Sequence, residues 1–472
     1  MSDNAPGNSG RRRFLRNLGY TALAGALGAC GMSRPESDDE AAAASSAEGM
    51  TYRINPGTGD TVSILGYGCM RFPTKGLTGK VDASSPEAED IDPEAVAESV
   101  DYAMAHGINY YDTSPAYCKG QSEAAIGEAL SKYPRDSYFI ATKLSNFAPS
   151  TWPREESVKM FENSLKYLRT DYVDYLLLHA IGGGGMEAFN SRYIDNGILD
   201  YLKEQRAAGR IRNLGFSYHG DIRVFDHLLA MMDAGEVHWD FAQIQLNYVD
   251  WAHAREVNPV NTNAEYLYSE LQKRGIPVVI MEPLLGGRLA SLPAPLAAKM
   301  KARRPDDSQA SWAFRYAGTP EGVLTVLSGM TYMEHLKDNL ATCSPLRPVS
   351  AEEDEFLQRI ALEYLENDIV PCTACRYCMP CPYGVDIPSV FTFYNKCINE
   401  DNVSRSDRDP HYDSARRAFL VGYERRIPRG RRADRCIGCG ECLIHCPQGI
   451  DIPAELAKID KYTLSLKKEG RI

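Results

Sequence analysis

Segments typical of strands and of helices alternate between residues 51 and 345, and this alternation restricts the fold more than any other feature of the chain. Apolar runs at 137–145 and 171–181 are followed by amphipathic segments at 155–168 and 198–211. Strands joined by helices pair in parallel through crossover connections. Eight such units predict a closed (β/α)8 TIM barrel. An open doubly wound sheet is the competing topology, but no glycine-rich nucleotide fingerprint follows the first strand.

Residues 51–68 begin this region with two alternating runs, separated by Pro56-Gly57 and Gly59-Asp60. Turn residues between alternating runs are typical of a β-hairpin. We therefore expect both runs to form a hairpin that serves as a lid on the barrel.

Polar side chains stand where three successive strands end. Asp112 and Tyr117 follow one apolar run, Lys143 closes the next, and His179 closes the one after that. The carboxyl ends of parallel strands meet at the face of a barrel where chemistry is done. A phenol titrates near pH ~10, so it needs a neighbouring positive charge to act as an acid at neutral pH. We expect Lys143 to lower the pKa of Tyr117, and Asp112 to keep Lys143 charged.

In these four residues the sequence resembles the aldo-keto reductase family, over roughly residues 51–345. Further matches are Ser122-Glu123, the segment ending at Ser217, and the segment from Glu282. The resemblance implies hydride transfer to a carbonyl carbon, with the tyrosine as general acid and the histidine as a second donor to the oxygen. The implied catalytic residues are Asp112, Tyr117, Lys143 and His179.

The same resemblance implies an NAD(P)H site. Family members that use NADPH carry basic residues after the last barrel strand, whereas this chain has Gly329 and His335 at the corresponding places and only Lys337 nearby. NAD, NADP and no soluble nicotinamide at all therefore stay open. The residues implied to bind the cofactor are Ser217, Gln243, Met281, Pro283, Leu284, Ser328 and Asn339.

Eight of the 13 cysteines form two short runs near the carboxyl terminus. The second run has the C-x2-C-x2-C-x3-C-P spacing of [4Fe–4S] proteins, and the first is shorter by one residue before its last cysteine. Zinc is the alternative for paired C-x2-C motifs. We expect residues 346–472 to form a small, mostly α-helical iron–sulfur domain, with its metal ligands at Cys372, Cys375, Cys378, Cys381, Cys436, Cys439, Cys442 and Cys446.

The cysteine-rich region resembles an alpha-helical ferredoxin with two [4Fe–4S] clusters. In two-cluster ferredoxins the cysteine before proline binds the other cluster. The resemblance therefore implies that Cys446 joins the first run and Cys381 the second. Six arginines lie close to the second run in the sequence: Arg425, Arg426, Arg429, Arg431, Arg432 and Arg435. They either offset the negative charge of the clusters, dock an acidic redox partner, or form a solvated basic loop.

The amino terminus is typical of a targeting segment. Arg11-Arg12, one further residue, and Phe14-Leu15 resemble a twin-arginine export signal. The segment ending in Cys30 resembles a lipoprotein cleavage box, which implies a lipid anchor there, and a chance cysteine is the alternative. We expect residues 1–30 to be the signal, 31–50 a disordered linker, and the mature protein to be periplasmic or membrane-anchored. If the signal is not used, the protein stays cytoplasmic.

Charge narrows the function classes further. The formal net charge of −11 argues against a general nucleic-acid binder.

The expected function is an oxidoreductase that reduces an aldehyde or ketone, or oxidises the matching alcohol, and carries two [4Fe–4S] clusters. Two alternatives stay open. The clusters feed electrons to the barrel from a membrane or periplasmic donor, or the barrel is a non-catalytic binding module beside structural or sensing clusters.

Overall fold

The computed structural model describes residues 49–82, 85–404 and 406–468. The expected signal, Cys30 and nearly all of the expected linker lie outside these residues. Within them, no helix combines the length and the apolar character needed to cross a bilayer.

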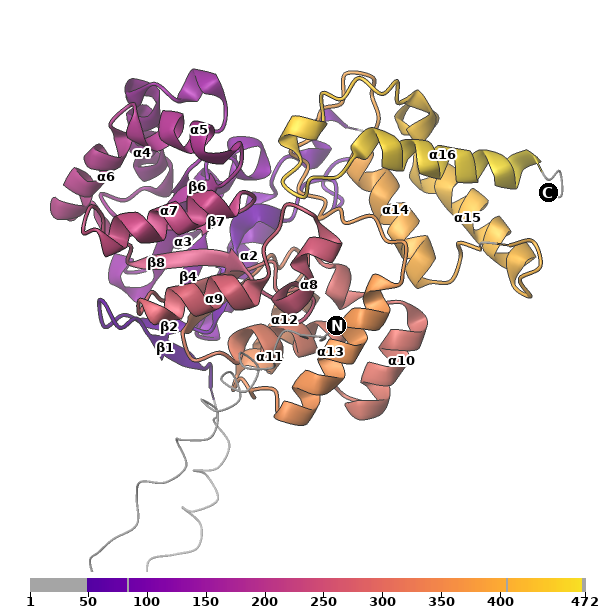
Figure 1. The fold of residues 1–472 in the computed structure, drawn as a ribbon, viewed down its shortest axis with the longest axis horizontal. Coiled ribbons are helices and arrows are strands. Elements are labelled where there is room, and N and C mark those ends of the chain that lie inside the picture. The colour runs from indigo at the N-terminus through magenta and orange to yellow at the C-terminus, as the bar shows by residue number, and fades with distance from the viewer. Residues whose placement is uncertain (1–48, 83–84, 405, 469–472) are drawn as a thin grey trace, which may run out of the picture.

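Eight parallel strands close into a barrel, as predicted (Figure 1). Around the barrel each strand is hydrogen-bonded to the next one along the chain, and β10 closes the circle by pairing with β3. The interior is filled by apolar and aromatic side chains such as Tyr110, Tyr175 and Phe241. The strands are β3 (Leu65–Gly68), β4 (Tyr110–Asp112), β5 (Phe139–Leu144), β6 (Val173–Ile181), β7 (Ile211–Tyr218), β8 (Phe241–Gln245), β9 (Val278–Met281) and β10 (Val323–Ser328).

Helices surround the barrel and bury their apolar faces against it. The first of them begins where Asp92 caps the backbone amides of Glu94 and Ala95 and a proline follows, a typical helix start. The helices are α2 (Pro93–Ala105), α3 (Ser122–Leu130), α4 (Arg154–Leu168), α5 (Gly185–Phe189), α6 (Ile198–Ala207), α7 (Ile222–Asp233), α8 (Asp250–Val257), α9 (Ala264–Lys273), α10 (Ala294–Arg303), α11 (Gln309–Gly318) and α12 (Met333–Cys343).

The amino-terminal hairpin is shorter than expected. Only β1 (Tyr52–Ile54) and β2 (Thr61–Ser63) pair antiparallel, and the rest of the second run becomes the barrel strand β3. The assignment of all of residues 51–68 to a hairpin was therefore wrong. Val62 is buried in the cluster that fills the barrel, and the Asn55 amide donates to the Tyr175 hydroxyl at 3.1 Å. The hairpin thus covers the end of the barrel where the strands begin, away from the expected catalytic face.

Helix α13 (Ala351–Leu365) follows the expected domain boundary at residue 346 but packs on the barrel. Ser350 and Glu353 form a capping box at its start. Glu353 also forms a 2.7 Å ion pair with Arg315 of α11. Leu357 and Ile360 belong to the same apolar cluster as the barrel helices. Burial therefore places this helix with the barrel.

Three helices carry the cysteine-rich region beside the barrel (Figure 1): α14 (Ile387–Asn399), α15 (Tyr412–Arg426) and α16 (Ile452–Lys468). They enclose a separate apolar core around Phe391, Phe419 and Leu456. A 2.6 Å ion pair between Arg376 and Glu89 joins this region to the barrel. The helical region is thus a second, smaller unit attached to the first.

Candidate active site

The first pair of predicted catalytic residues forms a buried ion pair. Strands β4 and β5 are neighbours, so Asp112 at the end of one lies next to Lys143 of the other. The Lys143 ammonium donates to Asp112 Oδ1 at 2.5 Å and to the Thr113 carbonyl at 2.9 Å. Both side chains are almost fully buried. Burial raises the pKa of Asp112 and lowers that of Lys143, and the attraction between the two charges opposes both shifts.

Tyr117 lies above this ion pair. A turn closed by its own backbone amide, which donates to the Ser114 carbonyl, brings the ring back over the strand ends. Its ring centroid is 4.9 Å from the Lys143 ammonium. The ring of His179, at the end of β6, stands edge-on to it at a centroid distance of 6.0 Å. The structure therefore brings all four predicted residues together.

The pKa of Tyr117 is not lowered below its usual value, contrary to the expectation from the neighbouring Lys143. The pKa of Tyr117 is raised well above its usual value, chiefly by burial and then by the negative charge of Asp112 and by Tyr377, Cys69 and Glu282. The Lys143 ammonium lies over the ring of Tyr117 and donates its hydrogen bonds to Asp112 and to the Thr113 carbonyl. The spacing of these residues in the sequence does not show how deeply the Tyr117 side chain is buried. Tyr117 is therefore held firmly in its protonated form.

A chain of hydroxyl groups orients His179. Ser114 accepts from the Ala116 amide at 3.1 Å, its hydroxyl lies 2.8 Å from the Ser145 hydroxyl, and Ser145 lies 2.6 Å from His179 Nδ1. Burial and the nearby cations Lys143 and Arg192 hold the pKa of His179 well below its usual value, so the ring is neutral. If Ser145 donates to Nδ1, the neutral ring carries its proton on Nε2 and offers it as a donor.

Two of the residues implied to bind nicotinamide are neighbours on adjacent strands. Ser217 of β7 and Gln243 of β8 pair in register, and both are buried. Within the described chain, Gln243 Oε1 is buried without a hydrogen-bond partner. A buried acceptor without a donor is costly and fits the amide group of a nicotinamide ring. This end of the implied cofactor site therefore fits the group.

The remaining implied residues lie at the ends of β9 and β10 and in the segments that follow them. Met281 ends β9, and the buried Pro283 and half-buried Leu284 follow it. After β10, the Asn339 amide donates to the Ser328 hydroxyl at 2.9 Å, and both side chains are buried. The structure thus places these residues at the ends of β9 and β10, in the loop after β9, and on helix α12.

The first cysteine run packs directly on the segments that follow β9 and β10, which sequence reasoning missed. Arg71, whose side chain covers Gly329, donates to the Thr373 carbonyl. A Cβ on Gly286 would lie 2.5 Å from the Thr373 Cβ, so only glycine permits this approach. The loop after β9 and the segment that carries Cys372 and Cys375 are therefore pressed together at the mouth of the barrel.

Tyr377 was also missed, because it lies between two cysteines far along the sequence. Its ring is 6.3 Å from that of Phe147, and Phe147 is 4.8 Å from His179, both as centroid distances. After burial and the charge of Asp112, Tyr377 also contributes to the raised pKa of Tyr117. The iron–sulfur region thus supplies part of the aromatic wall beside the catalytic residues.

The eight cysteines fall into two spatial groups. Cys446 of the second run contributes, with Cys375, to the raised pKa of Cys372. Cys381 of the first run contributes to the raised pKa of Cys442. In the described parts of the chain, no three potential ligands converge on a point suited to a single metal ion.

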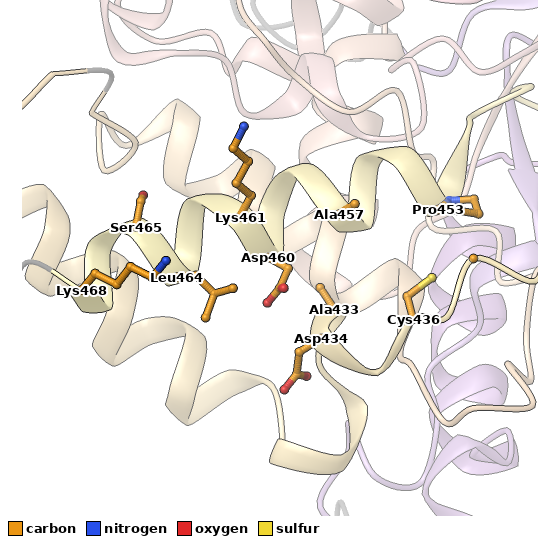
Figure 2. A pocket seen from close by; sticks show the side chains of 11 residues that line it. Ala433, Asp434, Cys436, Pro453, Ala457, Asp460, Lys461, Leu464, Ser465 and Lys468 are labelled. Carbon is orange, nitrogen blue, oxygen red and sulfur yellow. The ribbon is translucent and has the colours of Figure 1, made fainter.

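A surface pocket of about 470 Å³ lies beside the second cysteine run, between α16 and the residues before Cys436 (Figure 2). Asp434 and Asp460 line it together with Lys461 and Lys468. None of the four barrel residues lines this pocket, so it is separate from the candidate active site.

A parallel barrel with an Asp–Lys pair, a protonated tyrosine and a neutral histidine at its carboxyl face defines an oxidoreductase, and the cysteine runs add an iron–sulfur domain. The chain belongs to the aldo/keto reductase family, whose model matches residues 65–360. A 4Fe-4S dicluster domain matches residues 371–450.

Relatives cover most of the barrel. L-galactose dehydrogenase of Arabidopsis thaliana is 27% identical over 66% of this chain and 93% of its own length. The NADH-specific methylglyoxal reductase of Escherichia coli is 25% identical over 59% of this chain and 90% of its own. A solved aldo-keto reductase from Klebsiella pneumoniae in complex with NADPH aligns with a TM-score of 0.50, at 21% identity, over 66% of this chain and 96% of that one. This likeness concerns the fold.

Proposed function

We propose that this protein is an exported reductase of aldehydes or ketones that uses a nicotinamide dinucleotide and carries two [4Fe–4S] clusters. The observation that carries the proposal is the contact set of Tyr117, which stands over the Lys143–Asp112 ion pair and against His179. A lone lysine or histidine at a strand end is ordinary, whereas the four converging side chains form an acid–base site.

The barrel residues perform proton transfer and orientation. The substrate carbonyl oxygen lies between the Tyr117 hydroxyl and His179 Nε2, and both donate to it. Tyr117 gives its proton to the oxygen as negative charge develops there. The Lys143 ammonium stabilises the phenolate that remains, and Asp112 holds the ammonium in place. His179, oriented through Ser145, stays neutral and keeps its donor aimed at the oxygen.

Nicotinamide, when bound, supplies hydride to the carbonyl carbon. Gln243 Oε1 would accept from the carboxamide, with Ser217 beside it. We propose NADH in preference to NADPH. The Lys337 ammonium lies 5.6 Å from the ring centroid of Tyr102, so it is turned to helix α2. The Escherichia coli relative, named as NADH-specific, is consistent with this choice.

The cysteine groups support two four-cysteine clusters. One would be held by Cys372, Cys375, Cys378 and Cys446, and the other by Cys381, Cys436, Cys439 and Cys442. Thiolates are the ligands that such clusters use. The first group lies against the barrel mouth through Thr373, which favours coupling between the clusters and the reductase site.

Export is proposed from the sequence of residues 1–30. The twin-arginine pattern suits a protein whose clusters must be assembled before it crosses a membrane, and Cys30 would carry the lipid anchor. Labelling of the full-length protein with a radioactive fatty acid, compared with a Cys30→Ser variant, tests the anchor.

Anaerobically purified protein tests the function as a whole. We expect a broad iron–sulfur absorbance, and turnover of small aldehydes with NADH faster than with NADPH. A protein that carries both clusters but turns over no carbonyl compound with either nicotinamide contradicts the reductase proposal. It would favour electron supply through the clusters or a binding module.

The rate of reduction should be insensitive to pH over a wide range. Lowering the pKa of His179 extends its neutral form to lower pH, and raising the pKa of Tyr117 extends its protonated form to higher pH. We expect kcat/KM for reduction to be constant from about pH 6 to about pH 9. Alcohol oxidation needs the phenolate, so its rate should rise with pH throughout. An apparent pKa near 7 to 8 in the reduction profile contradicts the assignment.

Removal of the Tyr377 ring should weaken substrate binding without removing activity. An aromatic contact contributes about 0.5–1.5 kcal/mol, so Tyr377→Ala should raise KM about two- to tenfold, with a smaller change in kcat. Tyr383→Ala is the matched control, because Tyr383 is 45% exposed on the same segment. Steady-state kinetics and cluster absorbance of both variants test this. Equal effects in the two variants would show general damage to the iron–sulfur region.

A further inference from the structure

The two cysteine runs face different surroundings. The first run packs against the barrel through Thr373, which is buried. The second run is open to solvent. Cys439 is exposed, and three apolar neighbours stand out around it: Ile437 at 63%, Leu443 at 42% and Ile444 at 86% exposure. Apolar side chains this exposed, grouped around one site, mark an interaction surface.

Several arginines precede this exposed run in the sequence. Two neighbouring arginines are already engaged: Arg432 is buried and donates to the Ile427 carbonyl, and Arg431 lowers the pKa of Glu89 on the barrel. For the other four, no carboxylate of the described chain lies within 4 Å, and all four are exposed; they are Arg425, Arg426, Arg429 and Arg435. Unpaired arginines are available for an external acidic group.

This group of unpaired arginines contrasts with the chain as a whole, whose formal net charge is −11. The overall charge therefore repels an acidic protein, whereas the unpaired arginines attract it locally. Charge complementarity of this kind orients an encounter and raises its rate. We define the docking surface as the exposed residues Arg429, Arg435, Ile437, Cys439, Leu443 and Ile444.

We propose that the docking surface binds an acidic one-electron carrier protein. The exposed isoleucines and the leucine supply the apolar contact, and the two arginines meet carboxylates at its rim. In each encounter the carrier would lose one electron, and the cluster that the second run would hold would gain it. This inference goes beyond the reductase proposal, because docking does not depend on the barrel residues.

The test measures cluster reduction itself, in the full-length protein with both clusters. A reduced plant-type [2Fe–2S] ferredoxin serves as the acidic probe, and the second-order rate of cluster reduction is followed by stopped-flow absorbance. We expect Arg429→Glu/Arg435→Glu to lower this rate about tenfold or more at low salt and to weaken its dependence on salt. Reduction by dithionite, which needs no protein contact, should change by less than twofold.

Lys301→Glu/Arg347→Glu is the matched control, because it changes the net charge equally at two exposed barrel positions. Its rate with ferredoxin should stay within about twofold of the wild type. Equal losses in both double variants, or no loss in either, overturn the proposal. Vesicles with anionic headgroups test whether the docking surface binds a membrane instead. If Arg429→Glu/Arg435→Glu abolishes binding to these vesicles but leaves the rate of reduction by ferredoxin unchanged, the surface binds a membrane and the proposal is overturned.

Ile444→Ser separates docking from general electrostatics. This side chain is 86% exposed, so its loss should leave folding and cluster absorbance unchanged. We expect the affinity for oxidised ferredoxin, measured by surface plasmon resonance, to fall about threefold or more. An unchanged affinity together with an unchanged reduction rate would contradict an apolar contact at this site.

Discussion

Replacing Tyr117 with phenylalanine should lower kcat for carbonyl reduction by about 10²- to 10⁴-fold, the usual contribution of a positioned general acid. The variant keeps the ring that stands against His179 and over the Lys143 ammonium, and it loses only the hydroxyl. Steady-state kinetics with an aldehyde and NADH, together with the iron–sulfur absorbance, measure the effect. Both spectrum and stability should match those of the wild type.

Tyr110→Phe is the control for this experiment. Tyr110 is fully buried on the strand that carries Asp112, and within the described chain its hydroxyl has no hydrogen-bond partner. Loss of that hydroxyl should leave kcat within about twofold of the wild type. Activity retained in Tyr117→Phe, or lost equally in both variants, would remove Tyr117 from the role of general acid.

Replacing Lys143 with methionine should destabilise the fold more than any other change discussed. It leaves Asp112 buried without its counter-ion, and breaking a buried pair costs about 3–5 kcal/mol. Thermal and urea unfolding measure the loss. Adding Asp112→Leu to the Lys143→Met variant removes the buried, unpaired carboxylate as well. The double variant should therefore recover much of the lost stability, as a double-mutant cycle would show.

The destabilisation should depend on pH in a defined direction. Without Lys143, burial alone acts on Asp112 and raises its pKa above the value in the unfolded chain. A carboxyl with a raised folded pKa binds more protons in the native state, so stability falls as pH rises through that pKa. Lys143→Met should thus be nearest to the wild type at acidic pH. If the loss of unfolding free energy in Lys143→Met does not change with pH, Asp112 is not buried as an unpaired carboxylate in that variant.

Much of the barrel and its four central residues followed from local pattern. Alternating strands and helices leave few topologies, and in a parallel barrel successive strands are neighbours, so residues that end them must meet. The hairpin was misassigned because strand β2 continues almost directly into β3, and an alternating pattern does not reveal where the partner strand changes. Ser114 and Ser145 were missed for a similar reason: a serine gains its role only from the atom that it faces.

The sequence by itself determined the type of each catalytic side chain and the strand end at which it lies. Both depend only on the residue itself and on the pattern of its near neighbours in the chain. The tertiary structure alone decided two further matters. Burial at the barrel mouth keeps Tyr117 protonated, against the expectation that Lys143 would lower its pKa. The packing of Thr373 on Gly286 brings a cysteine run and Tyr377 to the catalytic face from far along the chain. Both features depend on which segments, far apart in the chain, pack together and exclude water from the catalytic face. A local sequence pattern does not show which segments these are.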